Sequence, residues 1–572
     1  MAVYGQEYKA IDFSKGLWLT DDADNVPEGY CAQLTNFYIN ETGEASLRPN
    51  YCPISVVGTT NVLKSDITNT TWTASPPEYD FDRFHKAFSS NAVAFNDPIL
   101  VSTSQTTAPD GIVRWIRRSG FAGLSVTMDV SAMPRELAQY RDRYYALNIA
   151  GLNISRWTFN ASTITIGSLQ TFTEELNSLV VFRDRLFASG INRLYFTDLP
   201  TSGGYPENWN SANNFISMPA LGATIVNMLV HNDRIFIFTT EGVYQLYALG
   251  EPTNWTLTLI SPNVRVQRKN AVALVENTFV YCDLNQVYLF NGTSTKEIGD
   301  PIRYALSFDT YRIRTGNSGY SEQNAPSAVR IIPYQEGFIM ATASSDFYDE
   351  EWVNNGTPRY FYFDGSWSEI QFNGATISGV EAHVSLINVI KNKRTAMPIS
   401  AGGRETDIIV ELRANRLDGS NIPDRFDIIF YSVRNSNTQS LTAPTFTATL
   451  ITRQVNIQTA PNILARLFEP IVTLKNSLRV LSANLRTDSD IATTSPSVST
   501  GATASPIFSF TDVIRIPTTI ERTATIEVAL EVLFTNATYS QVEESFPSAK
   551  IKSILYKTNT DTRQIPDQAY RT

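Results

Sequence analysis

The order of polar and apolar positions between residues 181 and 292 repeats one pattern three times. Segments 182–187, 231–236 and 276–281 each open with a polar turn and continue into a short apolar run. Counted from Asp184, Asp233 and Asn277, a tyrosine follows eleven residues later in every copy. These tyrosines are Tyr195, Tyr244 and Tyr288. The pattern therefore indicates an internal repeat.

Each copy predicts a β-hairpin. An Asp or Asn before the apolar run suits a tight turn, and Phe, Ile, Val and Tyr suit a half-buried strand. A second turn follows in each copy, at 189–190, 241–242 and 285–286, before an aromatic-rich strand. One such hairpin would be unremarkable, and three could resemble one another by chance. Separations of 49 and 44 residues instead favour propeller blades, whose repeats are about 40 to 50 residues long.

Looser copies extend the repeat in both directions. Segment 140–145 places Asp142 42 residues before Asp184, and Asp97 lies 45 residues earlier again. Segments 334–340 and 360–367 supply the apolar runs for one further unit. The sequence thus predicts an all-β fold, with a β-propeller of about six blades over residues 61–395.

The remaining chain predicts other β structure. Residues 1–60 hold short β-type pieces between Gly and Pro turns, which indicates an extended arm packing on the ring or propeller. Residues 396–572 contain alternating runs, most clearly 525–535, which predict a C-terminal β-sandwich or barrel. Segment 462–486 is compatible with a helix, although Pro470 would interrupt that helix. Residues 487–505 are almost all Ser, Thr, Ala, Asp and Pro, which predicts a mobile loop.

Charge and cysteine content narrow the possible functions. The 572-residue chain has a net charge of −10, and its Lys and Arg residues form no basic stripe. This composition argues against tight binding of nucleic-acid phosphates. Cys31, Cys52 and Cys282 are too few for a disulfide framework, so we expect small buried residues. The first residues lack a signal-peptide core and no apolar run reaches about 20 residues, so we expect synthesis in a cytoplasm and no membrane span.

Catalytic and metal-binding motifs are sparse. No nucleophile elbow, Walker loop, HExxH or Rossmann glycine pattern occurs. The acidic segment 21–25 lacks the Gly and terminal Glu of a calcium loop, and His85, His231 and His383 have no second ligand nearby in sequence. We therefore predict no metal, no cofactor and no catalytic residue. A glycosidase-type propeller would need paired carboxylates, for which the candidates are Asp198, Asp283, Asp364 and Glu369.

A resemblance to a known group of proteins starts at the N-terminus. Gly16, the segment 26–29 (Val-Pro-Glu-Gly), Asn36, Gly43 and the pair Arg48-Pro49 look like the opening of tail proteins from short-tailed bacteriophages. These are the tail nozzle (tail tubular B type) and the tail hub, or packaged-DNA-stabilisation, type. The centre of the chain resembles them too, at the segments 184–187, 208–209, 238–244 and 287–292. The similarity covers about residues 10–300 and lies in the pattern, without one diagnostic motif.

This resemblance implies a structural virion protein and not an enzyme. The expected assembly is a homohexameric ring, docked on a portal or adaptor ring and bearing fibres or spikes. It would enclose the DNA exit channel, help retain the packaged double-stranded genome and pass it to the host without sequence-specific binding. The expected location is the virion tail.

An acidic loop and a Ser/Thr-rich loop are the candidate channel or contact segments. The first is 345–355, and the second is the Ser/Thr-rich stretch 487–505. Their candidate residues are Asp346, Asp349, Glu350, Glu351, Asp488 and Asp490. Two rival hypotheses stay open: a carbohydrate-binding or glycan-degrading propeller used for host attachment, and a cytoplasmic scaffold propeller.

Overall fold

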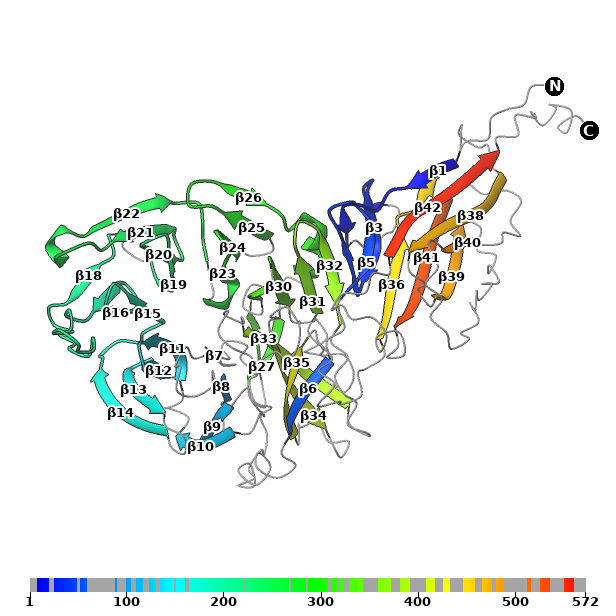
Figure 1. The fold of residues 1–572 in the computed structure, drawn as a ribbon. Helices are drawn as coiled ribbons and strands as arrows, with labels where there is room; N and C mark the ends of the chain where they lie inside the picture. Colours follow the sequence, from blue (N-terminus) through cyan, green and yellow to red (C-terminus); the bar gives the residue numbers. More distant parts are fainter. Residues whose placement is uncertain are drawn as a thin grey trace, which may run out of the picture. The chain divides into compact units, whose positions relative to one another are not determined.

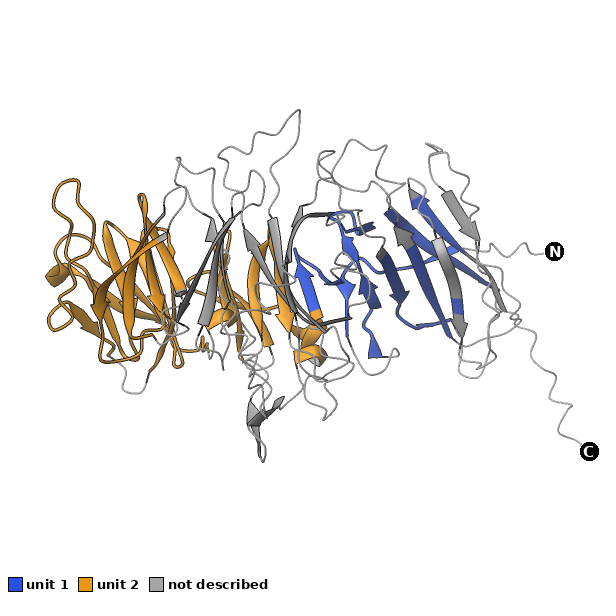
Figure 2. Cartoon of the chain, turned by 90° about the horizontal axis from the view of Figure 1, so that it is seen from below, with its two compact units in different colours: residues 1–52, 360–375, 442–572 blue, residues 53–359, 376–441 orange. Residues whose placement is uncertain are grey.

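The structure is a computed structural model of the 572-residue chain. It describes residues 8–19, 25–48, 52–58, 88–89, 99–103, 110–116, 123–129, 134–148, 151–159, 164–219, 223–266, 269–283, 286–306, 311–315, 319–323, 329–334, 336–342, 359–371, 381–390, 408–416, 425–432, 446–457, 466–475, 480–487, 512–515, 525–534 and 550–559. The chain divides into two compact units, coloured separately in Figure 2. Unit 1 comprises residues 1–52, 360–375 and 442–572, and unit 2 comprises residues 53–359 and 376–441.

Unit 2 is built from four-stranded antiparallel sheets (Figure 1). Five of them follow one another along the chain: β7 (Phe88–Ser89), β8 (Ile99–Thr103), β9 (Asp110–Ile116) and β10 (Gly123–Asp129); β11 (Pro134–Tyr140), β12 (Arg143–Asn148), β13 (Asn153–Phe159) and β14 (Ile164–Thr171); β15 (Ser178–Phe182), β16 (Arg185–Ser189), β17 (Arg193–Phe196) and β18 (Phe215–Ser217); β19 (Ile225–His231), β20 (Arg234–Thr239), β21 (Val243–Tyr247) and β22 (Thr256–Ser261); β23 (Val272–Val275), β24 (Thr278–Asp283), β25 (Gln286–Phe290) and β26 (Thr295–Glu297).

A sixth four-stranded sheet joins distant parts of the chain. Its order is β33 (Glu381–Ile390), β34 (Ile408–Arg416), β35 (Arg425–Ser432) and β6 (Cys52–Gly58). Unit 2 also holds two hairpins, β27 (Tyr311–Thr315) with β28 (Gly319–Gln323), and β29 (Arg330–Tyr334) with β30 (Gly337–Thr342). Its helical turns are η5 (Pro252–Asn254), η6 (Lys269–Ala271), η7 (Asp300–Ile302) and α2 (Arg303–Leu306). No helix in the described part of the chain has the length and apolar character that crossing a bilayer would require.

The sheets of unit 2 are arranged as propeller blades. From the second sheet onward, the first strand of each blade lies beside the first strand of the next, in the order β11, β15, β19, β23, β29 and β33. Apolar side chains fill the space between neighbouring blades, so one cluster joins Leu147 to Leu186 and the next joins Phe187 to Ile237. The predicted all-β propeller of about six blades is confirmed.

The repeated hairpins occupy equivalent places in successive blades. Each one joins the first strand to the second through a two-residue turn, as between β15 and β16 or between β19 and β20. In these turns Arg183, Asp184, Asn232 and Asp233 all have φ between 45° and 59°. Two consecutive positive φ values define a type I′ turn, which matches the twist of the strands and favours Asn and Asp. This geometry explains why Asp or Asn precedes each apolar run.

Unit 1 contains the strands from both ends of the chain. Its first sheet runs β4 (Phe37–Ile39), β5 (Ala45–Leu47), β42 (Lys550–Asn559), β38 (Arg466–Lys475) and β40 (Asp512–Arg515), with β1 (Tyr8–Ile11) paired to β42. Its second group of paired strands holds β31 (Arg359–Phe363), β32 (Trp367–Ile370), β2 (Gly16–Leu17), β3 (Tyr30–Thr35), β36 (Phe446–Thr452), β41 (Thr525–Phe534), β37 (Val455–Asn456) and β39 (Val480–Thr487).

The unit boundaries differ from the predicted divisions at residues 60 and 395. Of the strands predicted as an arm on the propeller, β1, β3 and β5 pair instead with strands from the C-terminal part of the chain. Strands β34 and β35, predicted to begin the C-terminal domain, belong to a blade of unit 2. Long-range backbone pairing decides both assignments, and local composition does not encode it.

Two local predictions also need correction. Segment 462–486, left open for a helix, contains β38 and β39, and the register of β38 shifts around Pro470 because proline cannot donate to a ladder. In β41, the residues Ile526, Val528 and Leu530 are buried as expected. The opposite face of β41 was expected to be exposed to solvent. It is partly covered, because Glu527 is 9% exposed and Ala529 is 7% exposed.

Candidate contact surface

The residues that carry the N-terminal pattern form a buried polar centre in unit 1. Asn36 is fully buried with a φ of 61°, and its Oδ1 accepts hydrogen bonds from Arg48 Nε (2.8 Å) and from the amide of Gln371 (2.9 Å). Its Nδ2 donates to the carbonyl of Thr447 at 2.7 Å. Arg48 is 2% exposed and also donates to the carbonyl of Gln371 at 2.9 Å. A buried cation needs several such partners, so these two residues hold three separate chain segments together.

A connected group of polar side chains lies in unit 2, on the connection between β17 and β18. Asp198 shapes this connection, because its carboxylate accepts from Asn208 Nδ2 (2.6 Å) and Asn214 Nδ2 (2.7 Å). Trp209 is 9% exposed and meets Phe172 edge to face, with ring centroids 5.5 Å apart. The connection is therefore held at both of its ends and at its tryptophan.

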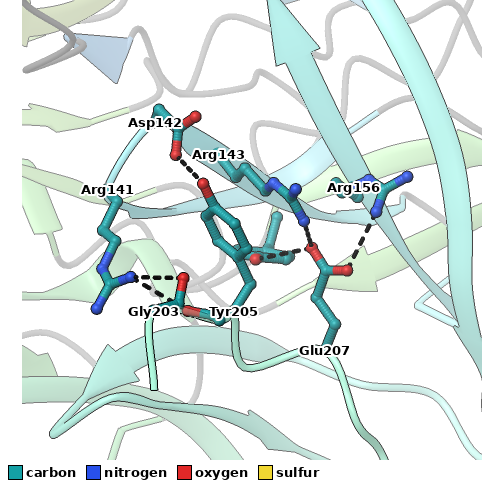
Figure 3. A network of polar contacts seen from close by, with 9 residues as sticks. Arg141, Asp142, Arg143, Arg156, Gly203, Tyr205 and Glu207 are labelled. Atoms are coloured by element: carbon teal, nitrogen blue, oxygen red, sulfur yellow. Dashed lines mark hydrogen bonds and ion pairs between the residues drawn. The ribbon is translucent and has the colours of Figure 1, made fainter. Parts of the chain in front are cut away.

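Glu207 joins this connection to the preceding blade (Figure 3). Its Oε1 accepts from Arg143 NH1 at 2.6 Å and from Tyr145 OH at 3.1 Å, and its Oε2 accepts from Arg156 NH1 at 3.1 Å. Arg143 and Tyr145 lie on β12, and Arg156 lies on β13. We call Glu207 and these three partners the Glu207 cluster. Burial alone would lower the pKa of Arg143, but the hydrogen bond and charge of Glu207 outweigh it and raise that pKa.

Further contacts fix the same connection against the turn between β11 and β12. Tyr205 OH donates to Asp142 at 2.6 Å, and the Arg143 guanidinium lies 3.4 Å from the centre of the Tyr205 ring. Arg141 NH1 donates to the carbonyls of Gly203 and Gly204, both at 3.2 Å. Figure 3 shows these groups pointing toward one another. The repeated Asp of the hairpin, here Asp142, thus anchors a loop of the next blade.

This arrangement suits binding or rigid support. Every carboxylate in it accepts hydrogen bonds from Arg, Tyr or Asn side chains, so none is left as a free general base. Burial and then Glu207 raise the pKa of Tyr145, which keeps that hydroxyl a donor. Within the cluster Tyr145 is fully buried, and the Arg143 and Arg156 side chains are 25% and 38% exposed, so the two arginines reach the surface and the tyrosine does not.

The four carboxylates considered for an enzyme lie on separate elements. Asp198 is held by two amides, and Asp283 lies at the end of β24, where burial raises its pKa and Arg265 lowers it. Asp364 is in the turn between β31 and β32, and Glu369 is on β32, both in unit 1. The described residues include no group of three or more His, Cys, Asp or Glu side chains able to hold a metal ion.

The remaining predicted residues divide into described and undescribed ones. Cys31 and Cys282 are fully buried, as expected, and burial raises the pKa of Cys282 to about 12. The His231 and Phe279 rings meet edge to face with centroids 5.7 Å apart. The His231 Nε2 atom lies 2.8 Å from Asn232 Nδ2. The segment 21–24, His85 and the candidate channel residues lie outside the described part of the chain. Those channel residues are Asp346, Asp349, Glu350, Glu351, Asp488 and Asp490.

Sequence reasoning missed the Glu207 cluster. The signal that was present is one acid beside a tryptophan in a Gly- and Pro-containing stretch, residues 201–210. Its partners Arg143 and Arg156 lie 64 and 51 residues away in sequence. Only the packing of one blade on the next brings them together.

Comparisons with known proteins add little to this description. No protein-family model matches the chain, and no curated protein does. The Neurospora crassa Pan2 WD40 domain has 8% identity and a TM-score of 0.37, covering 68% of this chain and 97% of that chain. The S. cerevisiae Dbp5 complex with Nup159 and Gle1 gives a chain with 8% identity and a TM-score of 0.34, with coverages of 67% and 96%.

A Bacteroides fragilis protein described as a 6-phosphogluconolactonase has 11% identity and a TM-score of 0.33, with coverages of 50% and 82%. Similarities at this level carry no argument about function. The fold assignment of this chain, an all-β protein with four-stranded propeller blades, rests on its own sheets.

Proposed function

We propose that this protein is a structural component of a short phage tail. In this proposal, copies of the chain form a ring, a nozzle or hub, around the path by which packaged DNA leaves the particle. The ring docks on a portal or adaptor, carries fibres or spikes, and helps retain the genome until ejection. The protein then acts through shape and contact and has no catalytic step.

One observation carries the proposal. The residues that resemble the phage tail proteins are residues on which the fold of unit 1 depends. Gly16 and Gly43 adopt φ values of 90° and 77°, and Asn36 and Arg48 form the buried polar centre. Each of these positions restricts which residue can stand there, so the resemblance falls on positions that matter for the fold of unit 1.

Charge and chemistry favour the same proposal. At −10, the chain would repel DNA phosphates wherever its acids faced the channel, and the duplex would slide past. Clustered Lys and Arg would have the reverse effect, a salt-sensitive grip on the backbone. The carboxylates of Glu207 and Asp198 accept hydrogen bonds that hold one connection of unit 2 in place.

The composition of purified virions tests the proposal. Particles from the host that carries this gene should contain the chain at a fixed multiple of the portal, and gold-labelled antibodies should bind at the tail. Its absence from full, infectious particles would contradict the proposal. The channel hypothesis for the loops has its own test, deletion of residues 488–504 followed by measurement of DNA leakage. Unchanged retention would exclude that loop as a plug.

A further inference from the structure

One ion pair in unit 2 joins two blades that are not neighbours. Glu136 lies on β11, and Lys269 lies in η6, directly before β23. The Lys269 ammonium contacts Glu136 Oε2, and both side chains are nearly buried, at 11% and 8% exposure. Between these blades stand two others, because β11 lies beside β15, β15 beside β19, and β19 beside β23. Lys269 therefore reaches Glu136 past two intervening first strands.

The intervening blades are tied into the same group. Lys269 Nζ also donates to the carbonyl of Asn177 at 2.6 Å, and the amide of Leu179 donates to Glu136 Oε2 at 2.9 Å. Asn227 Nδ2 donates to the carbonyl of Lys269 at 3.1 Å. Glu136, Leu179, Asn227 and Lys269 thus connect the starts of four successive first strands.

We propose that this ion pair, which we call the axial ion pair, is a lock that fixes the circumference of the propeller at the end where the first strands begin. Contacts between neighbouring blades allow each blade to hinge on the next. A bond across the axis removes that freedom, because opening any of the intervening joints must pull Lys269 from Glu136. Loss of either charge loosens both distant blades together.

The energetics of buried charges give this proposal a sharp test. Removing one partner of a buried ion pair is strongly destabilising, whereas removing both can be nearly neutral. Glu136→Gln keeps an oxygen for the amide of Leu179, and Lys269→Met keeps most of the side-chain length. The exposed pair Arg183–Asp233, at 3.4 Å and 31% and 82% exposure, provides the control through Asp233→Asn.

Hydrogen exchange of the whole protein measures the effect. We expect E136Q and K269M each to speed amide exchange by about tenfold or more in both 134–140 and 272–283, since each tenfold step corresponds to about 1.4 kcal/mol of local opening. The double variant E136Q/K269M should exchange more slowly than K269M, and D233N should match the wild type.

Two results would overturn the lock. One is faster exchange confined to the blade that carries the substitution. The other is a double variant whose effect equals the product of the two single effects, which would mean that the residues act independently. If K269M yields no folded protein, the double variant decides: a folded double supports the coupling and an unfolded double contradicts it.

Discussion

Tyr140, the last residue of β11, donates a 2.8 Å hydrogen bond from its hydroxyl to Asp184 Oδ1, in the type I′ turn of the next blade. The following turn repeats the relationship with other residues, because Arg183 pairs with Asp233 of the blade after it at 3.4 Å. In these two turns the Asp does two things: it adopts the turn conformation, and it accepts a contact from the preceding blade. Asp142 differs, because its partner Tyr205 belongs to the next blade.

Replacing Tyr140 by Phe should weaken that joint. The hydroxyl is largely buried, and its loss removes one hydrogen bond to a charged acceptor, so we expect a destabilisation of roughly 1 to 2 kcal/mol. Urea unfolding followed by fluorescence measures the change. Tyr247 is 40% exposed, and Tyr247→Phe is the control, with an expected change of less than about 0.5 kcal/mol. Equal effects for the two variants would show that the Tyr140–Asp184 bond contributes nothing.

Gly16 should tolerate no side chain. A Cβ at Gly16 would lie 2.7 Å from the carbonyl oxygen of Trp367, and the φ of Gly16 is 90°. Gly365, also in unit 1, has a φ of 114°, but a Cβ there would meet nothing within 4 Å. We expect Gly16→Ala to cost about 2 kcal/mol or more and Gly365→Ala about 1 kcal/mol, because only the first adds a backbone clash to the strain. Thermal melts of both variants compare the two costs, and an unchanged melting temperature for G16A would refute the local geometry.

Glu207→Ala should release the connection between β17 and β18. The substitution leaves the buried Tyr145 hydroxyl and Arg143 without their carboxylate partner, at a cost of about 1 to 2 kcal/mol. Limited proteolysis should then cut within residues 198–214 several times faster than in the wild type. Arg156 is 38% exposed in its pair with Glu207, so Arg156→Met should have a much smaller effect. Identical cleavage rates for E207A and the wild type would remove the cluster as the anchor of this loop.

The carboxylate of Asp283 should make the protein less stable at pH 7 than the side-chain amide of an asparagine at the same position. Burial raises the pKa of Asp283 above its ordinary value of 3.8, with Arg265 as a partial offset. A raised folded-state pKa contributes stability that is present below the unfolded value and is lost as the pH rises through the folded value. Asp283→Asn should therefore melt higher than the wild type at pH 7, and the difference should shrink on acidification toward pH 3.8. A variant that melts lower at pH 7 would show that the carboxylate is stabilised in the folded state.

The sequence predicted what local chemistry controls. Type I′ turns need residues that accept positive φ, so the Asn232-Asp233 turn and its equivalents were visible as a repeat. The alternation around Val528 and Leu530 likewise predicted the inward face of β41, because strand periodicity is local.

Contacts between distant segments could not be predicted in the same way. Arg48 donates to Gln371 across 323 residues, and Glu136 meets Lys269 across 133. The pairing of β1 with β42, which places the N-terminal strands in unit 1, is also long-range. Such pairings depend on how complete sheets assemble, and a single buried Lys or Arg in the sequence does not indicate its partner.

An electron cryo-microscopy map of the virion tail tests the central claim most directly. We predict a ring of identical copies in which both units fit separate densities around a DNA-sized channel, with the chain visible in genome-filled particles. A tail map that is fully explained by other proteins, with no density matching the four-stranded blades of unit 2, would contradict the account.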